Sequence, residues 1–251
     1  MALELKAVDV YHSYHGQPAL DGVSLVVPAG TVTVLVGESG SGKTTLLRSF
    51  NRLVDPDRGT VTVGDNSVRA EKPEVLRRRL GYVPQHGGLL PHWTVRGNVS
   101  LVPRLVGMSS PDGAAEEALR RVGLDPVKFG GRLPAELSGG QRQRVALARA
   151  FAARQQVVLL DEPFGALDSI SRAEVHEAFE HVREELGFTA LLVTHDLAES
   201  ARLADQVVVM RRGRVEQSGT IAALQRSPAT LYVQTLFQRA KAAYAPLLDA
   251  Q

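Results

Sequence analysis

The residues with the clearest chemistry form a glycine-rich loop near the start of the chain. Residues 37–44, GESGSGKT, match the spacing G-x-x-x-x-G-K-[ST]. Glycines let backbone N–H groups surround a phosphate, because no Cβ atom stands in the way. A lysine at this spacing places positive charge between two phosphates, and the threonine hydroxyl after it can bind Mg²⁺. The loop therefore predicts a phosphate site, with Lys43 on the phosphates and Thr44 on the metal.

A pair of carboxylates follows a second apolar segment. Asp161 and Glu162 come directly after VVLL at 157–160, and Pro163 ends that segment. Ligands bind at the carboxyl ends of buried parallel strands, so two acids in this place can act on a bound phosphate compound. We expect Asp161 to hold Mg²⁺ through water and Glu162 to orient and deprotonate an attacking water. The alternative is an ordinary polar strand end that enters a loop.

A second anion site is predicted farther along the chain. Before the helical pattern RQRVALARAF come Ser138, Gly139, Gly140 and Gln141. A serine with glycines at a helix N-terminus can bind an anion. One nucleotide pocket does not need two such sites, but two chains arranged head to tail would use both, with the Lys43 loop of one facing the Ser138 loop of the other. The alternative is that Ser138 only caps its helix.

The elements that must position these residues alternate between strands and helices. Helical patterns separate three predicted buried strands, at 31–36, 157–160 and 189–193. This order indicates an α/β fold with a mostly parallel, doubly wound sheet. Helical patterns without strands fill residues 87–155, which predicts an inserted helical subdomain. Alternating strands in the first 30 residues and at 60–70 predict a small antiparallel layer.

Composition excludes several classes of site. The 251 residues contain no cysteine, so disulfides, zinc–thiolate sites, iron–sulfur clusters and cysteine nucleophiles are excluded. The net charge of +2 does not by itself favour nucleic acid. No apolar run reaches the roughly 18–20 residues that span a bilayer, and the first ten residues lack the apolar core of a signal peptide. A cytosolic protein is the simplest interpretation.

Together the motifs resemble those of the nucleotide-binding subunit of an ABC transporter, over almost the full length of the chain. GESGSGKTT resembles the Walker A loop, LSGGQ the signature motif, and VVLLDEP the Walker B strand with its catalytic glutamate. Gln85 in YVPQ resembles the Q-loop glutamine, and His195 in VTHD the switch histidine. Ala166-Leu167-Asp168 resembles the D-loop.

The resemblance implies a single nucleotide-binding domain over residues 1–251. Its core would be a P-loop NTPase (RecA-like) fold with a mostly parallel sheet and a small antiparallel layer. An ABC-type helical subdomain would occupy roughly 87–155, and a C-terminal helical tail roughly 226–251.

The resemblance also implies roles around ATP and Mg²⁺. Tyr14 would stack on adenine, Gln85 would contact Mg²⁺ and water, and His195 would touch the γ-phosphate while holding Glu162 and the water in place. Metal contacts would come from Thr44, Gln85 and Asp161. The phosphates would be held by the loop and the helix that follows it, namely Gly37, Glu38, Ser39, Gly40, Ser41, Gly42, Lys43, Thr44 and Thr45. The other cofactor-binding residues would be Ser138, Gly139, Gly140, Gln141 and Asp168.

Several of these assignments have an ordinary structural alternative. Tyr14 could be a half-buried tyrosine on a strand, and Gln85 could cap a turn. His195 could be a histidine that is satisfied at a strand end. Asp168 could cap the helix beginning at Ser169, alone or in addition to its implied role.

Three classes of P-loop protein compete for this chain. LSGGQ disfavours a P-loop kinase or GTPase. The short distance in sequence from Lys43 to Ser138 leaves no room for the long coiled coil of DNA-repair members, and ribosome-acting members usually carry two such domains. We therefore expect a transport ATPase on the cytoplasmic face of the cell membrane. Its partners would be a second ATPase subunit, as a head-to-tail homodimer or pair, transmembrane permease subunits and, indirectly, a substrate-binding protein, with no nucleic acid.

Local resemblance favours an importer of osmoprotectants such as glycine betaine, choline, carnitine or proline. The most telling segment is PHWTVRGNVSLVPRLVG at 91–107. Two features depart from those subunits: the chain ends at Gln251 without their C-terminal CBS modules, and Leu90 stands where phenylalanine is usual. The alternatives are another type I importer, for amino acids, methionine or sulfonates, a lipid or lipoprotein exporter, or a non-transport ABC ATPase.

A last expectation concerns the segment His86–Thr94, which opens the helical block. It carries Leu89, Leu90 and Trp93, an unusual number of large apolar residues for a loop. Apolar side chains exposed together can form a docking patch, here for a short helix of the membrane subunit. The alternative is that these side chains pack inward beneath the helices.

Overall fold

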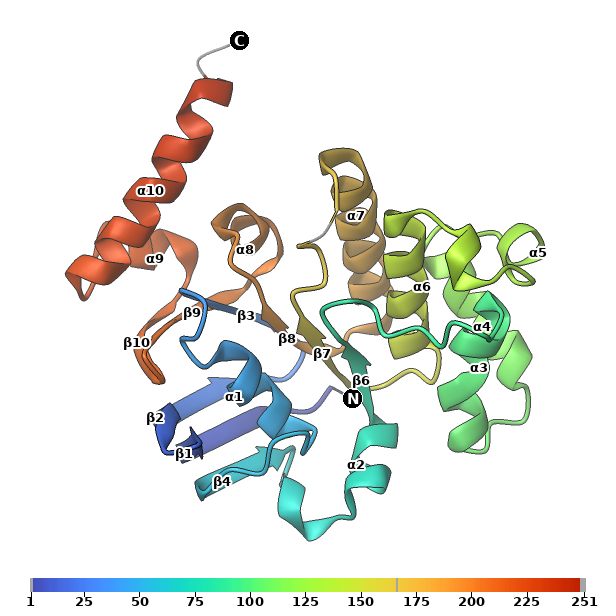
Figure 1. The fold of residues 1–251 in the computed structure, drawn as a ribbon, viewed down its shortest axis with the longest axis horizontal. Helices are drawn as coiled ribbons and strands as arrows, with labels where there is room; N and C mark the ends of the chain where they lie inside the picture. Colours follow the sequence, from blue (N-terminus) through green and yellow to red (C-terminus); the bar gives the residue numbers. More distant parts are fainter. Residues whose placement is uncertain (1, 166, 249–251) are drawn as a thin grey trace.

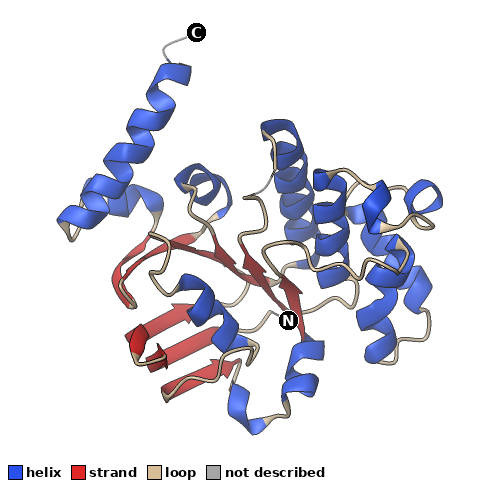
Figure 2. Cartoon of the chain, in the orientation of Figure 1, coloured by secondary structure: helices blue, strands red, loops and turns tan. Residues whose placement is uncertain are grey.

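Two β-sheets face each other across helix α1, and a group of helices extends from one side of the larger sheet (Figures 1 and 2). The computed structural model describes residues 2–165 and 167–248. The smaller sheet is antiparallel, has the order β2-β1-β4-β5, and comprises β1 (Leu5–Tyr14), β2 (Gln17–Val27), β4 (Arg58–Val63) and β5 (Asn66–Ser67). It is the antiparallel layer that the sequence predicts.

The larger sheet has the order β10-β9-β3-β8-β7-β6. All its neighbouring strands pair in parallel except β10, which runs antiparallel to β9. Its strands are β3 (Val32–Val36), β6 (Leu80–Val83), β7 (Val157–Asp161), β8 (Thr189–Val193), β9 (Gln206–Arg211) and β10 (Arg214–Gly219). Every residue of β3, β7 and β8 is buried, as expected for parallel strands covered on both faces. The predicted α/β fold with a mostly parallel sheet is confirmed.

The helices divide between the sheets and the helical side of the molecule. Those close to the sheets are α1 (Lys43–Phe50), α2 (Pro73–Arg79), α7 (Ser169–Leu186), α8 (Leu197–Leu203) and α9 (Ile221–Arg226). The helical side contains α3 (Val95–Leu105), α4 (Pro111–Arg121), α5 (Pro126–Phe129) and α6 (Gly139–Phe151), which lie within the predicted helical segment. The last helix, α10 (Leu231–Leu248), projects away from the sheets (Figure 1).

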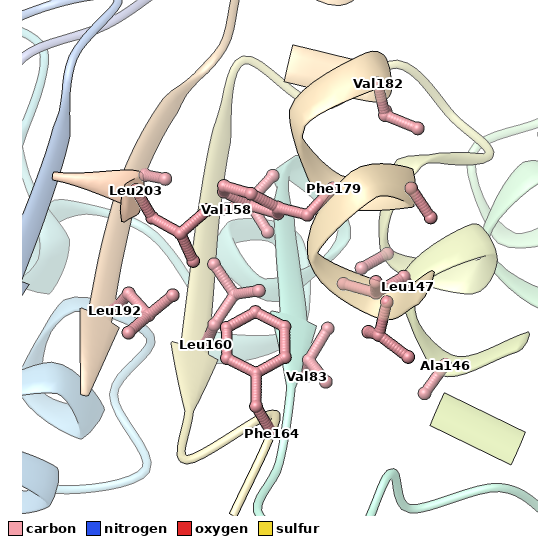
Figure 3. Close-up of a cluster of buried hydrophobic side chains, with 14 of the residues drawn as sticks. Val83, Ala146, Leu147, Val158, Leu160, Phe164, Phe179, Val182, Leu192 and Leu203 are labelled. Atoms are coloured by element: carbon pink, nitrogen blue, oxygen red, sulfur yellow. The ribbon is translucent and has the colours of Figure 1, made fainter. Parts of the chain in front are cut away.

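Two apolar cores lie on opposite faces of the larger sheet, because side chains alternate along each strand. On β7, Val158 and Leu160 belong to the core beneath α6 and α7, whereas Leu159 belongs to the core beneath α1. Figure 3 shows Phe179 of α7 directed toward Val158 of β7, with Leu147 of α6 in the same cluster of buried side chains. The α6–α7 core joins the helical side to the sheet, so the Ser138 motif at the start of α6 is held on a packed element.

The structure differs from the sequence prediction at one predicted strand and at two short helices. Val68 belongs to a short 3₁₀ turn, Val68–Ala70, and not to a strand, because Ser67 accepts a hydrogen bond from the Arg69 N–H and starts the turn. Helices α5 and α9 have no counterpart in the sequence prediction, since each is a short helix with a weak periodic signal.

In the part of the chain that the structure describes, no helix has the length and apolar character needed to cross a membrane.

Candidate active site

Four neighbouring strands of the larger sheet deliver the candidate residues to one edge. The order β3-β8-β7-β6 places side by side the segments that follow these strands. These segments carry, in the same order, the Gly37 loop, His195, the Asp161–Glu162 pair and Gln85. Parallel strands end at the same edge, so residues far apart in sequence come together here (Figure 1).

Two glycines allow the Gly37–Thr44 loop to lie tightly against the body of the protein. Gly37 has φ of +146°, and a Cβ atom there would stand 2.1 Å from the Met210 carbonyl oxygen. Gly42 caps α1 with φ of +99°, and a Cβ atom there would stand 2.4 Å from the Ala19 carbonyl oxygen. Any larger residue would push the loop away from β9 or β2. Between the two glycines, Glu38, Ser39 and Gly40 are exposed.

Lys43 is buried in this loop and held by its backbone. Its Nζ donates to the carbonyl oxygens of Gly37 and Glu38, each at 2.8 Å, and to Ser41 Oγ at 3.2 Å. Burial lowers the pKa of Lys43, and the nearby carboxylates of Glu162 and Asp161 oppose that shift. The ammonium group therefore lies inside the loop and close to both acids.

Asp161 connects the end of β7 to the first turn of α1. The Thr44 hydroxyl donates to Asp161 Oδ1 at 2.7 Å, and Arg48 Nη2 lies 3.1 Å from Asp161 Oδ2. Arg48 was not expected from the sequence, although it lies one helical turn after Thr44 on the same face of α1. Thr45, also in the first turn, is half-buried.

The oxygen donors at this point suit Mg²⁺. A hydroxyl and a carboxylate in direct contact are hard ligands of the kind that Mg²⁺ uses together with substrate phosphates. Among the described residues, no group of three or more His, Cys, Asp or Glu side chains could hold a metal without such help. The site therefore fits a metal that arrives with a phosphate ligand.

Glu162 is the centre of a second cluster. Gln85 Nε2 donates to Glu162 Oε2 at 3.3 Å, and His195 Nδ1 lies 3.4 Å from the same oxygen. The Glu162 backbone has φ of +47°, a conformation that costs a non-glycine residue about 1–2 kcal/mol. Its N–H donates to the Val193 carbonyl oxygen at 3.0 Å, which holds it in place. Three strand ends thus converge on one carboxylate oxygen.

The Ser138 motif forms the N-terminus of α6. Ser138 Oγ accepts from the Gln141 N–H at 3.2 Å, and Gln141 Oε1 accepts from the Ser138 N–H at 3.0 Å. This is the helix cap considered as the alternative, and it also orders the exposed N-terminus of α6. A Cβ atom on Gly140 would stand 2.9 Å from the Ser171 side chain, so α6 begins directly against α7. The motif lies on the helical side, away from the Gly37–Thr44 loop at α1 (Figure 1).

Tyr14 and Asp168 lie at the borders of the site. Tyr14 ends β1, is exposed, and packs edge-on to His12 with ring centroids 4.6 Å apart. Asp168 caps α7, because its Oδ1 accepts from the N–H groups of Ile170 and Ser171 at 3.1 and 3.0 Å. The hydrogen bonds from Ser171 hold the pKa of Asp168 below its usual range. Ala166 lies outside the described residues.

Side chains of α3 and α6 hold the segment 86–94 in place through hydrogen bonds to its backbone. Buried Asn98 accepts from the Leu90 N–H at 2.7 Å and donates to the carbonyl oxygens of Leu90, Trp93 and Thr94, each at 3.1 Å. Arg149 of α6 donates to the Gly87 and Gly88 carbonyl oxygens, both at 2.7 Å.

The prediction of an exposed docking patch is wrong for Leu89. Leu90 and Trp93 are 37% and 43% exposed. Leu89 instead packs against the core beneath α6, because the Asn98 and Arg149 contacts turn it inward.

A family model described as ABC transporter matches residues 20–165. The chain belongs to this family. The match includes the Gly37 loop, Gln85, the Ser138 motif and the Asp161–Glu162 pair, all of which the structure has placed.

Two curated relatives show the range of named functions. The chain is 42% identical to the carnitine transport ATP-binding protein OpuCA of Listeria monocytogenes over 233 residues, which are 92% of this chain and 58% of that protein. It is 44% identical to the Fe(3+) ions import ATP-binding protein FbpC of Pseudomonas fluorescens over 233 residues, 90% of this chain and 64% of that protein. The chain therefore spans less than two thirds of the length of either relative.

A solved structure has a similar fold. The chain resembles the ATP-binding cassette MJ0796, in a dimeric post-hydrolysis state with ADP and phosphate, with a TM-score of 0.78 and 30% identity. The likeness covers 86% of this chain and 98% of that one. The ABC-type cassette fold that the motifs imply is confirmed.

Proposed function

We propose that the protein is an ATP-binding and ATP-hydrolysing subunit that powers import of osmoprotectants across a membrane. One observation carries the enzymatic part: Gln85 and His195 meet at one oxygen of Glu162, close to the buried ammonium of Lys43. A polarised carboxylate beside a phosphate-binding cation is the arrangement that hydrolysis of a triphosphate needs.

Each residue has a defined task in this proposal. Lys43 and the N–H groups of residues 38–45 neutralise the phosphates, and Glu162 takes the proton of the attacking water. Gln85 and His195 hold the Glu162 carboxylate in the correct orientation, and Tyr14 stacks on the adenine. Mg²⁺, when bound, neutralises the β- and γ-phosphate oxygens, and Thr44, Asp161 and Gln85 are the residues that would hold it.

The proposed active form is a head-to-tail dimer with two ATP molecules between the subunits. Its support is the separation of the two anion-binding motifs: the Ser138 motif begins α6 on the helical side, while Lys43 begins α1 beside the smaller sheet (Figure 1). Ser138, Gly139, Gly140 and Gln141 of one chain would complete the site on the other, and Asp168 would adjoin it. MJ0796, which has the same fold, is dimeric.

The proposed unit extends over residues 1–251 and works on the cytoplasmic face of the membrane. Within it the helical subdomain occupies roughly 87–155 and the helical tail roughly 226–251. Permease subunits would dock at Leu90 and Trp93, which are exposed on a fastened loop, and a substrate-binding protein would deliver the substrate to them. The alternative is a type I importer with another substrate, which the similar identity to the iron-import protein FbpC favours.

Reconstitution tests the proposed function and distinguishes import of a quaternary amine from import of Fe³⁺. The full chain is combined in liposomes with the permease and binding protein encoded beside it, and ATP hydrolysis is measured with carnitine, glycine betaine or Fe³⁺. We expect hydrolysis that rises with a quaternary amine and not with iron. Stimulation by Fe³⁺ alone would support the alternative, and absence of hydrolysis by the whole complex would contradict both.

A further inference from the structure

Arg172, in the first turns of α7, bridges two loops of the candidate site. Its Nη2 donates to the Leu167 carbonyl oxygen at 3.0 Å. Its Nη1 lies 3.6 Å from Asp196 Oδ2, and its Nε lies 3.8 Å from Glu199 Oε1. Leu167 belongs to the segment between Glu162 and α7, whereas Asp196 directly follows His195. One guanidinium group therefore contacts the segments that carry Glu162 and His195.

Buried Glu199 extends this contact to the other side of His195. It accepts a hydrogen bond from the Thr194 hydroxyl, and Thr194 is the residue before His195. The Asp196 N–H donates to Thr194 Oγ1 at 3.0 Å. The backbone on both sides of His195 is thus tied to the Glu199 and Arg172 side chains.

Arg172 supplies a permanent positive charge beside Glu199. Burial raises the pKa of Glu199, and Arg172 is among the groups that oppose this shift. His176 Nε2 also lies 3.9 Å from Glu199 Oε1, but burial lowers the pKa of His176 to about 4, so it is neutral at pH 7. A buried carboxylate without a nearby cation is costly, which makes Arg172 important to the position of Glu199.

We propose that Arg172 is a positioning residue for ATP hydrolysis, which holds the His195 loop against the Leu167 segment so that His195 stays on Glu162. The inference rests on the proposed roles of His195 and Glu162. The His195 side chain is 63% exposed, so packing around its ring restrains it weakly. Its position depends on the backbone at Thr194 and Asp196, which the Arg172 and Glu199 contacts hold. The planar guanidinium can contact all three partners at once, and a lysine cannot.

Steady-state kinetics of the full chain test this inference. We expect Arg172→Ala to lower kcat about tenfold and to leave KM for ATP within about twofold, because the phosphate loop is untouched. Arg172→Lys should be intermediate, since it keeps the charge and loses the fork. In a His195→Ala background, Arg172→Ala should lower kcat by less than about twofold, because the residue acts through His195.

Arg183 supplies the matched control on the same helix. Like Arg172 it binds a backbone carbonyl, that of Leu203, and a carboxylate, that of Asp205, and the two arginine side chains are 28% and 33% exposed. Arg183→Ala should keep kcat within about twofold. If Arg172→Ala fails to fold, Glu199→Gln replaces it, because the amide still accepts from Thr194 while losing its attraction to Arg172.

Two results would overturn the inference: wild-type kcat in Arg172→Ala, or an equal loss of kcat in the wild-type and His195→Ala backgrounds. The second would indicate a general structural role. If His195→Ala itself hydrolyses ATP at the wild-type rate, the proposed role of His195 fails, and the inference falls with it.

Discussion

Glu162 combines a strained backbone with two polar partners on one oxygen. Its φ of +47° directs the carboxylate to Gln85 and His195 rather than along the strand. Strain of this kind persists only where surrounding contacts maintain it, and here β8 provides one through the Val193 carbonyl. The residue is therefore held in place before any substrate binds.

Replacing this base should separate binding from hydrolysis. Glu162→Gln keeps the shape of the side chain and loses the base, so we expect kcat to fall about 10²–10⁴-fold. ATP binding should persist, and the dimer should accumulate with ATP bound. Single-turnover hydrolysis and size-exclusion chromatography with ATP measure these effects. Glu174→Gln is the control, because Glu174 pairs with Arg144 on the exposed side of α7. Hydrolysis at the wild-type rate by Glu162→Gln would show that Glu162 is not the general base.

His176 gives the protein a pH-dependent stability. The residue is buried edge-on against Phe164, with ring centroids 4.4 Å apart, and burial lowers its pKa from 6.5 to about 4. The unfolded chain therefore takes up a proton below pH 6.5 that the native chain does not. Its contribution to stability is complete above pH 6.5 and is lost as the pH falls toward 4.

Urea unfolding at pH 7, 6 and 5 measures this effect. Between pH 7 and pH 5 the loss of unfolding free energy should stay below about 2 kcal/mol, because pH 5 lies about 1.5 units below the ordinary pKa of histidine at about 1.4 kcal/mol per unit, and solvent screening reduces it. His176→Phe should flatten the dependence on pH, because the aromatic contact remains and the titration disappears. Exposed His181 on the same helix is the control, and His181→Gln should keep the wild-type slope. An unchanged slope in His176→Phe would exclude His176 as the cause.

At the scale of elements, α3 and α6 determine the shape of the segment 86–94. The Asn98 side chain at the start of α3 makes four hydrogen bonds to the backbone of this loop. Asn98→Ala should lower the free energy of unfolding by about 2–3 kcal/mol, because the Leu90 N–H and the Trp93 carbonyl lose the partner that Asn98 provides. Urea unfolding measures it, with exposed Asn66→Ala as the control.

The same variant has an optical readout. Trp93 is the only tryptophan in the chain, and Asn98 binds its carbonyl oxygen. Acrylamide quenching of Trp93 emission should rise in Asn98→Ala. Quenching and stability equal to those of the wild type would show that other contacts suffice to hold the loop.

Docking of the permease is best tested at Trp93. Trp93→Asp should keep the ATPase activity of the free subunit and abolish assembly with the permease, because the side chain is exposed on a fastened loop. Leu89→Asp should instead destabilise the free subunit, since Leu89 packs on the core. Co-purification and free-subunit ATPase activity measure both outcomes. Equal loss of free-subunit ATPase activity in the two variants would contradict the docking assignment.

At the scale of the whole molecule, one chain holds only half of the proposed charge stabilisation. Lys43 begins α1 between the two sheets, whereas the Ser138 motif begins α6 on the helical side of the subunit (Figure 1). ATPase activity should therefore rise more than linearly with protein concentration. Measuring rate against concentration from dilute monomer upward tests this, with Ser138→Ala expected to lower the rate at every concentration. A strictly linear dependence would contradict the dimer.

Much of this architecture could be predicted from the sequence, because local pattern and strand order carry it. VVLL is apolar at every position, and TVTVLV interrupts its apolar residues only with β-branched threonines, so both runs predict strands buried on both faces. Parallel strands end at one edge, which brings Lys43, Asp161, Glu162, Gln85 and His195 together without any knowledge of the packing.

Only the tertiary structure decided which side chains reach one another between elements. The contact of Arg48 with Asp161, the bridge from Arg172 to Glu199, and the inward position of Leu89 all depend on the distance and angle at which helices cross the sheet. Periodicity defines the face of an element on which a residue lies, but not the partner opposite that face. For this reason motifs identified the residues that would act on the nucleotide, whereas the side chains that hold them in position became visible only in the folded chain.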